Sequence, residues 1–152
     1  MEEQMSAIER AIATALDAHE GQVDKGGAPY ILHPLRVMAA VEQMCPDCPE
    51  EVLVAAVLHD VIEDSHFSHL DIQQMFGDKV VQYVNLLTKE IPDDLYYELI
   101  KRNRYACYIK LADLRDNMDV SRLSEITERD VIRINNYKRL EQEIIAAIAG
   151  VH

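Results

Sequence analysis

PEEVLVAAVLHDVIED, residues 49–64, is the stretch of sequence that decides the fold. Its middle, Val52–Leu58, is apolar on nearly every side of a helix, which is typical of a helix buried at the centre of a domain. Ionisable side chains follow at once: His59, Asp60, Glu63 and Asp64. Burying such groups together is unfavourable unless something compensates their charge. The stretch therefore predicts a buried central helix that ends in ionisable side chains of a functional site.

Helical periodicity also dominates the chain on either side of this stretch, whereas strand signals are weak. Residues 21–29 contain glycines and a proline and are expected to form a loop. Three pairs have the pattern of helix caps: Ser6 with Glu9, Ser68 with Asp71, and Thr127 with Asp130. We expect an all-α fold, a compact single-domain helical bundle over residues 1–152. The expected helices cover about 5–19, 34–44, 50–64, 68–76, 79–87, 94–103, 104–118 and 127–148.

The size and composition of the chain limit the class of protein. With 152 residues, of which 49% are apolar, the chain suits one folded domain rather than a disordered segment. It has no run of about 18 apolar residues and no basic-then-apolar N-terminus, so we expect no membrane span, no signal peptide and a cytoplasmic location. Its cysteines, Cys45, Cys48 and Cys107, are odd in number, which argues against a disulfide framework.

The net charge of the chain limits the classes of partner that it can bind. A net charge of −12 repels nucleic acid and anionic lipid at long range, which argues against both as partners. The same field opposes a phosphate-ester substrate. Such a substrate therefore needs a metal ion or a few basic side chains to reverse the sign of the charge locally. The oligomeric state is left open.

The ionisable residues that follow the apolar run are spaced for a common site. If the helix continues, His59 shares a face with Glu63, and Asp60 shares the next face with Asp64, because each pair is four residues apart. Acidic groups at the C-terminal end of a helix oppose its dipole, so Glu63 and Asp64 are poorly placed for stability. We interpret the group as functional: a His–Asp pair for a metal ion, with two carboxylates beside a bound water.

Two further segments carry matching chemistry. His33 precedes Pro34, which suits the first position of a helix and so places His33 at a helix N-terminus. Asp113 and Asn117 are four residues apart on a largely apolar helix, whereas Asp116 is expected to be exposed.

The candidate metal ligands are His33, His59, Asp60 and Asp113. Two imidazoles and two carboxylates suit Mn, Fe, Zn or Co better than Ca or Mg, which prefer oxygen ligands alone. A metal held this way lowers the pKa of a bound water and neutralises phosphate charge, which is the chemistry of phosphate-ester hydrolysis.

The order His33, His59-Asp60, Asp113 resembles that of the HD superfamily of metal-dependent phosphohydrolases, most closely its RelA/SpoT-type (p)ppGpp hydrolase branch. The matching segments are Ala18–Gln22, Gly27–Pro34, Leu58–Asp64, Phe76-Gly77, Thr88-Lys89 and Ile109–Asn117. The resemblance implies an all-helical hydrolase whose four ligands hold one divalent ion, Mn²⁺ by preference. It also implies that Glu63 and Asp64 position or deprotonate the attacking water. The implied reaction removes the 3′-pyrophosphate of (p)ppGpp, the nucleotide of the stringent response.

Five residues are expected to contact the nucleotide substrate: Lys25, Asn117, Lys110, Tyr30 and Asp24. The resemblance places Lys25 and Asn117 beside the nucleotide, Lys110 is a candidate phosphate contact, and Tyr30 is a candidate for stacking on a base. Asp24 departs from the family, which usually has a basic residue there that packs on guanine. A carboxylate cannot stack as a guanidinium does. Asp24 therefore predicts either guanine recognition by hydrogen bonds or weak base selectivity.

Two alternative functions stay open beside (p)ppGpp hydrolysis. One is a phosphohydrolase that acts on a nucleotide with another base or ester, as Asp24 suggests. The other is a non-catalytic domain that binds a metal ion or a nucleotide. The Glu63–Asp64 pair argues against the second alternative, because a domain that only binds has no need to activate water.

Overall fold

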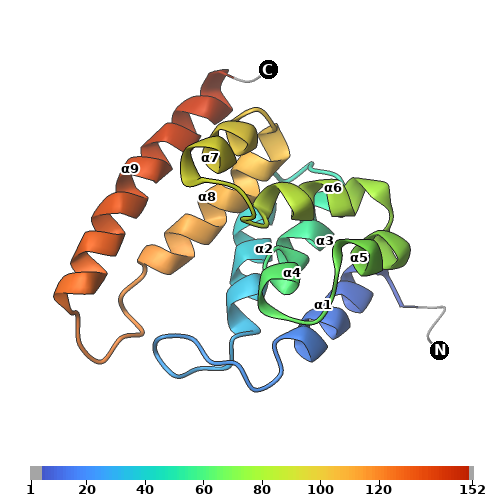
Figure 1. The fold of residues 1–152 in the computed structure, drawn as a ribbon, viewed down its shortest axis with the longest axis horizontal. Helices are drawn as coiled ribbons and strands as arrows, with labels where there is room; N and C mark the ends of the chain where they lie inside the picture. The colour runs from blue at the N-terminus through green and yellow to red at the C-terminus, as the bar shows by residue number, and fades with distance from the viewer. Residues whose placement is uncertain (1–4, 151–152) are drawn as a thin grey trace.

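Nine helices and their connecting loops form residues 5–150, which a computed structural model of the chain describes (Figure 1). Residues 1–4 and 151–152, the two ends of the expected domain, lie outside the described residues. The helices are α1 (Ala7–Ala18), α2 (Leu32–Met44), α3 (Glu50–Leu58), α4 (Val61–Asp64), α5 (His69–Phe76), α6 (Asp78–Leu87), α7 (Asp93–Lys101), α8 (Arg104–Met118) and α9 (Glu128–Gly150). Between residues 5 and 150 the only β-type pairing is an isolated bridge, Val23 with Pro29, in the expected loop. The all-α fold class is confirmed.

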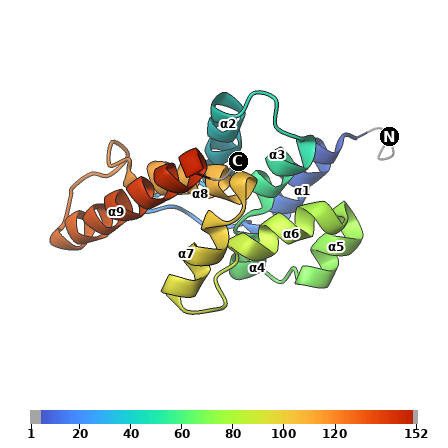
Figure 2. The same ribbon diagram turned by 90° about the horizontal axis from the view of Figure 1, so that it is seen from above.

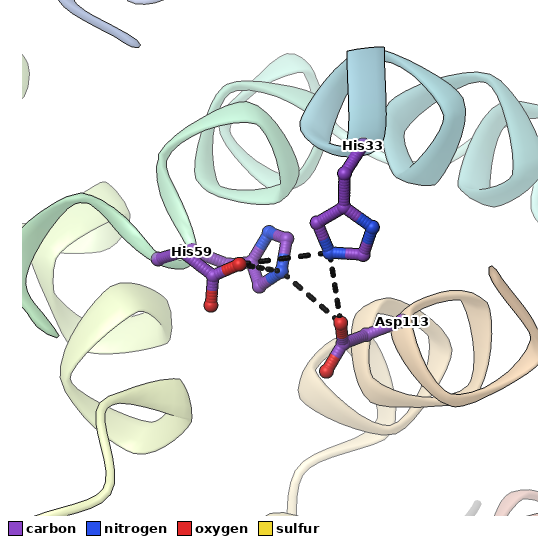
Figure 3. A group of neighbouring side chains, drawn as sticks. His33, His59 and Asp113 are labelled. Atoms are coloured by element: carbon purple, nitrogen blue, oxygen red, sulfur yellow. Dashed lines mark hydrogen bonds and ion pairs between the residues drawn. The ribbon is translucent and has the colours of Figure 1, made fainter. Parts of the chain in front are cut away.

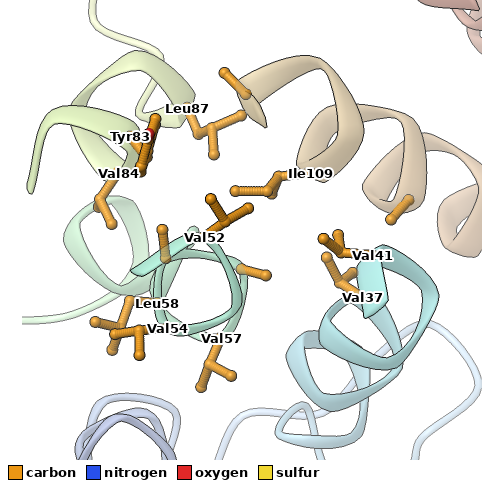
Figure 4. Packing of buried hydrophobic residues seen from close by; sticks show 14 of the residues in the cluster. Val37, Val41, Val52, Val54, Val57, Leu58, Tyr83, Val84, Leu87 and Ile109 are labelled. Atoms are coloured by element: carbon orange, nitrogen blue, oxygen red, sulfur yellow. The ribbon is translucent and has the colours of Figure 1, made fainter. Parts of the chain in front are cut away.

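Helix α3 is the buried centre of the fold, as its apolar sequence predicts. Val52 and Val54–Leu58 are almost completely buried, and α3 packs against α1, α2, α6 and α8 (Figure 4). The side chains around it come from three neighbouring helices: Val37, Val41, Val84, Leu87 and Ile109. Full burial of one such side chain contributes roughly 1.5–3 kcal/mol, so α3 is the element on which the other helices depend.

The predicted caps begin helices at the expected places. The hydroxyl of Ser6 accepts a hydrogen bond from the Glu9 amide, while the Glu9 carboxylate accepts one from the Ser6 amide. Ser68 and Asp71 make the same reciprocal pair at the start of α5, and the predicted pair before α9 does so too. Each pair satisfies amide groups that lack a partner in the first turn, which is typically worth about 1 kcal/mol.

The stretch after α3 is not the continuous helix expected from the sequence. Helix α3 ends at Leu58, His59 and Asp60 form a turn, and α4 begins at Val61. The prediction that the ionisable residues share two faces of one helix is therefore wrong. In a continuous helix the carbonyl of Ala56 would accept a hydrogen bond from the Asp60 amide. Here it accepts one from Nδ1 of His59 at 2.7 Å, so the side chain displaces the next helical bond.

Helix α2 also begins earlier than expected, at Leu32 instead of Pro34. His33 is thus the second residue of the helix rather than the residue before it. Pro34 is tolerated there because the amides of the first helical turn have no acceptor within the helix.

The loop after α1 and the loop before α9 border the same cavity as helix α9. Helix α9 packs along α8 at one edge of the molecule, and α5 lies at the opposite edge (Figures 1 and 2). The loop after α1 touches the loop before α9, since a Cβ atom on Gly26 would lie 2.6 Å from the carbonyl oxygen of Arg122. No helix within residues 5–150 is both long enough and apolar enough to cross a membrane.

Candidate metal centre and substrate cleft

The four expected metal ligands lie together at the inner end of α2, the α3–α4 turn and α8 (Figure 3). One ligand atom from each of His33, His59, Asp60 and Asp113 lies within 4.8 Å of all the others. Nε2 of His33 is 3.0 Å from Oδ1 of Asp113, and Nε2 of His59 is 3.1 Å from Oδ2 of Asp60. Residues up to 80 positions apart in the sequence thus share one buried cluster.

The orientation of both imidazoles suits a cation at the centre of this cluster. Nδ1 of His33 lies 2.6 Å from the Asp116 carboxylate, and Nδ1 of His59 lies 2.7 Å from the carbonyl of Ala56. Each Nδ1 therefore donates outward and each Nε2 faces the centre, where its lone pair would bind a metal ion once the ring is neutral, as in metal-bound histidines. Nε2 of His59 is buried and makes no hydrogen bond within residues 5–150. A divalent ion would satisfy this nitrogen together with the two carboxylates.

The cluster also has the charge balance of a cation site. Burial lowers the pKa of His33 and His59, but the neighbouring carboxylates outweigh burial and raise both pKa values, that of His59 strongly. Burial likewise raises the pKa of Asp113, but the Lys110 ammonium and both imidazoles hold that pKa well below its usual range. The carboxylates are thus anionic and attract either protons on the rings or a metal ion.

Metal affinity should therefore increase with pH. The folded protein holds protons on His33 and His59 up to the raised pKa values, and a metal ion must displace them. Lowering the pH below those values weakens binding, and raising it through them strengthens binding by about tenfold per pH unit for each proton displaced. Competition titrations with Mn²⁺ between about pH 6 and 9 measure this slope. An affinity that stays constant across that range would contradict the assignment of both rings.

Asp116 is the main residue whose role the sequence did not reveal. It was expected to be exposed, but its side chain is only 11% accessible. It accepts the Nδ1 hydrogen of His33 and a bidentate pair from Arg36, at 2.7 and 3.1 Å. Burial raises its pKa, yet these two partners bring the pKa of Asp116 down to about 2. Asp116 therefore fixes the tautomer and direction of the His33 ring.

Replacing Asp116 with asparagine should weaken metal binding by about 10–100-fold, the usual effect of losing a carboxylate behind a histidine ligand. The amide can still accept one hydrogen bond, but it loses the charge that both His33 and Arg36 face. Isothermal titration with Mn²⁺ gives the affinity. Asp47→Asn, an exposed aspartate in the α2–α3 connection, is the matched control. Equal affinities in the two variants would show that Asp116 does not support the site.

Two of the expected substrate contacts, Lys110 and Asn117, form hydrogen bonds with Asp113. Nζ of Lys110 lies 3.0 Å from Oδ2 of Asp113, and Nδ2 of Asn117 donates to Oδ1 at 3.0 Å. The Lys110 ammonium also lies over the rings of Tyr96 and Tyr97, 5.3 and 5.6 Å from their centroids. Both residues line the cleft described below, so they can face a substrate while they hold Asp113.

Tyr30, expected to stack on a base, is engaged with the metal cluster. Its hydroxyl donates to Oδ2 of Asp60 at 2.6 Å, and its ring lies between those of His19 and His33. Burial and the Asp60 charge raise the pKa of Tyr30, so the hydroxyl keeps its hydrogen. The ring is therefore already packed, and the residue acts on Asp60.

Glu63 and Asp64 lie on α4, next to the metal cluster. The Glu63 carboxylate accepts a hydrogen bond from the Lys89 amide, whereas the Asp64 carboxylate accepts none among residues 5–150. Burial, followed by the charge of Asp60, raises the pKa of both carboxyl groups. A raised pKa lies nearer to neutral pH, and a general base works best when its pKa is close to the working pH.

A two-part cleft runs over the metal cluster. The larger cavity, about 530 Å³, is bordered by His59, Asp60, Glu63, Asp64, Lys110 and Asp113. The smaller cavity, about 240 Å³, is bordered by the loop that carries Asp24 and Lys25. The residues that border both cavities are Tyr30, Asn117, Arg133 and Tyr137. The two cavities thus adjoin one another, with the metal cluster at their floor.

Helix α9 forms one wall of this cleft, which the sequence did not indicate. Arg133 and Tyr137 are four residues apart and face the same way. Nε of Arg133 is buried and makes no hydrogen bond within residues 5–150, although its terminal nitrogen pairs with Asp130 at 3.3 Å. Arginine and tyrosine at this spacing are common on any helix face, so no sequence signal separated them from packing residues.

Asp24 shapes the loop beside the smaller cavity. Its Oδ1 accepts hydrogen bonds from the amides of Gly26 and Ala28, both at 2.9 Å. Lys25, which follows it, is exposed on the same loop. Asp24 thus belongs to a hydrogen-bonded turn that closes the loop on itself.

Comparisons with known proteins identify the family of the chain. The family model of the HD domain matches residues 11–90. The bifunctional (p)ppGpp synthase/hydrolase SpoT of Escherichia coli strain K12 is 42% identical over 88 residues, which are 58% of this chain and 12% of that protein. The guanosine-3′,5′-bis(diphosphate) 3′-pyrophosphohydrolase of Aquifex aeolicus is 38% identical over 82 residues, which are 54% of this chain and 12% of that protein. The chain thus spans a small part of the length of these relatives.

A solved structure has the same fold over nearly the whole chain. It is that of a metazoan ortholog of SpoT that hydrolyses ppGpp and plays a role in starvation responses. The match has a TM-score of 0.77 at 24% sequence identity and covers 97% of this chain and 88% of that one. The likeness includes α8 and α9, which lie beyond the residues that the family model matches.

Proposed function

Because this chain belongs to the HD-domain family, we propose that it is a metal-dependent hydrolase that removes the 3′-pyrophosphate of (p)ppGpp. The observation that carries the proposal is the meeting of four metal-ligating side chains with Glu63 and Asp64 in one cleft. The names of the relatives supply the substrate, since they include hydrolases of this nucleotide. The ion is divalent, and we propose Mn²⁺ for it.

The proposed ligands are His33, His59, Asp60 and Asp113. When bound there, a divalent ion supplies Lewis-acid charge that activates water and neutralises phosphate. The side chains of the protein position the ligands, the water and the substrate. Asp60 and Asp113 are held in place by hydrogen bonds from Tyr30, Lys110 and Asn117.

Glu63 and Asp64 are the proposed water-activating pair. The Asp64 carboxylate is free to accept the proton of the attacking water, while the Lys89 amide holds the Glu63 carboxylate beside it. Tyr30 and Asp24 border the cleft, but their side chains are engaged with Asp60 and with the amides of their own loop. The proposed substrate contacts are therefore Lys25, Asn117 and Lys110, to which the geometry of the cleft adds Arg133. The cations among them answer the unfavourable net charge of −12, since they place positive charge where phosphates would lie.

A substrate screen tests the proposal. The purified chain, loaded with Mn²⁺, is offered ppGpp and a panel of other nucleoside polyphosphates and monophosphates, and the products are identified by chromatography. Release of pyrophosphate from ppGpp, with GDP left behind, is the expected result. Release of orthophosphate from other nucleotides would show that the chain hydrolyses a different phosphate ester. If no nucleotide gives a product while the metal is bound, the chain is a non-catalytic binding domain.

A second function, hydrolysis of nucleotides with another base, is favoured by Asp24. Its Oδ1 is already occupied by two amides of its own loop, and its Oδ2 is buried, so neither oxygen is exposed to a base. We therefore propose weak base selectivity, with affinity that rests on the metal and the phosphates.

Replacing Asp24 with alanine should raise KM by a similar factor for guanine and adenine polyphosphates, about 5–30-fold, because the loop loses two hydrogen bonds of about 1 kcal/mol each. Asp24→Asn, which keeps an acceptor oxygen for the turn, should stay close to wild type. Steady-state kinetics with matched guanine and adenine substrates distinguish the possibilities. A loss confined to guanine substrates, of about 1–3 kcal/mol in kcat/KM, would instead show that Asp24 reads the base.

A further inference from the structure

Helix α4, which carries Glu63 and Asp64, is too short to hold itself in place. It has four residues, whereas isolated helices shorter than about 12 residues are marginal in water. Its position therefore depends on contacts with the rest of the chain. Val61 is buried in the core, and the Glu63 carboxylate is tied to the Lys89 amide. The end of the helix, at Asp64, is tied by a different residue.

That residue is Gln22, which follows α1 and lies 42 positions away in the sequence. Its Nε2 donates to the Asp64 carbonyl at 2.8 Å and to the Ala18 carbonyl at 3.2 Å. Two carbonyl oxygens can only accept, so the amide group of Gln22 has one possible orientation. The carbonyl of Gln22 itself bonds the amide of Tyr30 at 2.9 Å. Gln22 thus joins α1, the loop after it and α4.

His19 fixes the other end of the Gln22 side chain. With Nε2 of Gln22 facing two carbonyls, its Oε1 faces Nδ1 of His19 at 2.9 Å. Because Oε1 is an acceptor, Nδ1 of His19 must carry a hydrogen. His19 is buried and packs against the ring of Tyr30, 4.8 Å between centroids, and its Nε2 makes no hydrogen bond within residues 5–150. The imidazole is therefore locked in both position and tautomer.

We propose that His19 and Gln22 form a latch that positions Asp64 for the reaction, and this rests on the proposed function. The Asp64 carboxylate accepts no hydrogen bond among the described residues, so its place in the cleft is set through its backbone. The Asp64 amide bonds the Asp60 carbonyl within α4, and the Gln22 bond to the Asp64 carbonyl ties this end of the helix to the rest of the chain. A shift of about 1 Å in a reacting group can lower a rate by about 10²-fold. The latch thus acts on turnover rather than on binding.

Kinetics of latch variants test the proposal. Gln22→Met keeps the length of the side chain but removes both donors, and it should lower kcat on ppGpp by about 10–100-fold. KM and Mn²⁺ affinity should stay within about threefold, because neither a metal ligand nor a substrate contact changes. Gln73→Met is the control, since Gln73 makes a comparable bond to Asp78 on the exposed surface of α5 and α6. Unchanged kcat in Gln22→Met would overturn the latch.

Variants at His19 separate positioning from bulk packing. His19→Asn places an amide donor near the position of Nδ1 and should retain most of the turnover. His19→Leu keeps an apolar side chain of similar bulk without the donor, and its kcat should fall with that of Gln22→Met. Equal losses in the asparagine and leucine variants would show that the hydrogen bond is irrelevant.

Two readouts do not depend on activity. Nitrogen-15 spectra of the imidazoles should show that, in the neutral His19 ring, the hydrogen is on Nδ1. In Gln22→Met, hydrogen exchange of the Asp64 amide, which bonds the Asp60 carbonyl at 3.0 Å, should become at least about tenfold faster. A hydrogen on Nε2 instead, or unchanged exchange, would overturn the latch even in an active enzyme. A wild-type protein with both signatures but no turnover would overturn the proposed function and leave the latch standing.

Discussion

Replacing Asp113 with asparagine should lower kcat/KM by at least about 10³-fold, beyond the 10–100-fold typical of a residue behind a metal ligand. Oδ1 of Asp113 lies 3.0 Å from Nε2 of His33 and 3.4 Å from Nε2 of His59. Its Oδ2 lies 3.0 Å from the Lys110 ammonium. A neutral amide removes the charge that all three partners face, so the metal should be lost with the activity. Metal content after gel filtration and kcat/KM are the two measurements.

The same change should destabilise the fold, because it leaves Lys110 with less counter-charge. A fully buried pair typically loses about 3–5 kcal/mol when one partner is removed, and the loss here should be smaller, about 1–3 kcal/mol, since Lys110 borders the cleft. Urea unfolding gives this value. Asp47→Asn, at an exposed position in the α2–α3 connection, is the control and should change neither the free energy of unfolding nor kcat/KM. A variant of Asp113 that still binds Mn²⁺ as tightly as wild type would remove this residue from the ligand set.

Replacing Asp64 with asparagine, or Glu63 with glutamine, should lower kcat by about 10²–10⁴-fold while the metal stays bound. An amide is too weak a base to accept the proton of the attacking water. In Glu63→Gln the new side-chain oxygen would still accept the Lys89 amide hydrogen, so the geometry of the pair should survive. Steady-state kinetics and a metal titration on each variant give the two quantities. Near-normal turnover in both single variants would rule out the water-activating role.

Two further measurements sharpen this test. If both carboxylates act on one water, their effects should not add. The kcat of the double variant should then lie within about tenfold of the kcat of the slower single variant. Burial raises the pKa of both carboxyl groups, and only the deprotonated form accepts a proton. kcat should therefore rise as the pH increases through the raised pKa and then level off. Glu98→Gln, exposed on α7, serves as the control for both measurements.

Much of the fold follows from local sequence. The apolar run Val52–Leu58 predicts the buried central helix, and residues that cap helices within three positions, such as Ser68 with Asp71, set where helices begin. These features depend on neighbours in the chain, so periodicity and capping chemistry are enough to find them. The family was also recognisable from the order of motifs along the chain, and the family match supports it.

The break between α3 and α4 marks the limit of this local reasoning. Helical spacing predicts that the helix runs through His59, because each residue considered alone tolerates a helix. At the turn, Nδ1 of His59 takes the Ala56 carbonyl, while Nε2 of the same ring lies in the metal cluster, 3.1 Å from the Asp60 carboxylate. A tertiary requirement on one side chain thus overrides the periodicity of its neighbours.

The sequence by itself determined the helical fold, its central helix, its caps and the chemical types of the candidate ligands. Only the tertiary structure decided how these residues act on one another. It places the half-buried Asp116 behind His33, 83 positions away, and brings Gln22 to Asp64, 42 positions away. It also makes α9 a wall of the cleft, where sequence offered only an ordinary helix face. The physical reason is that propensity and capping act within a few residues, whereas the environment of a charge depends on side chains that only packing brings into contact.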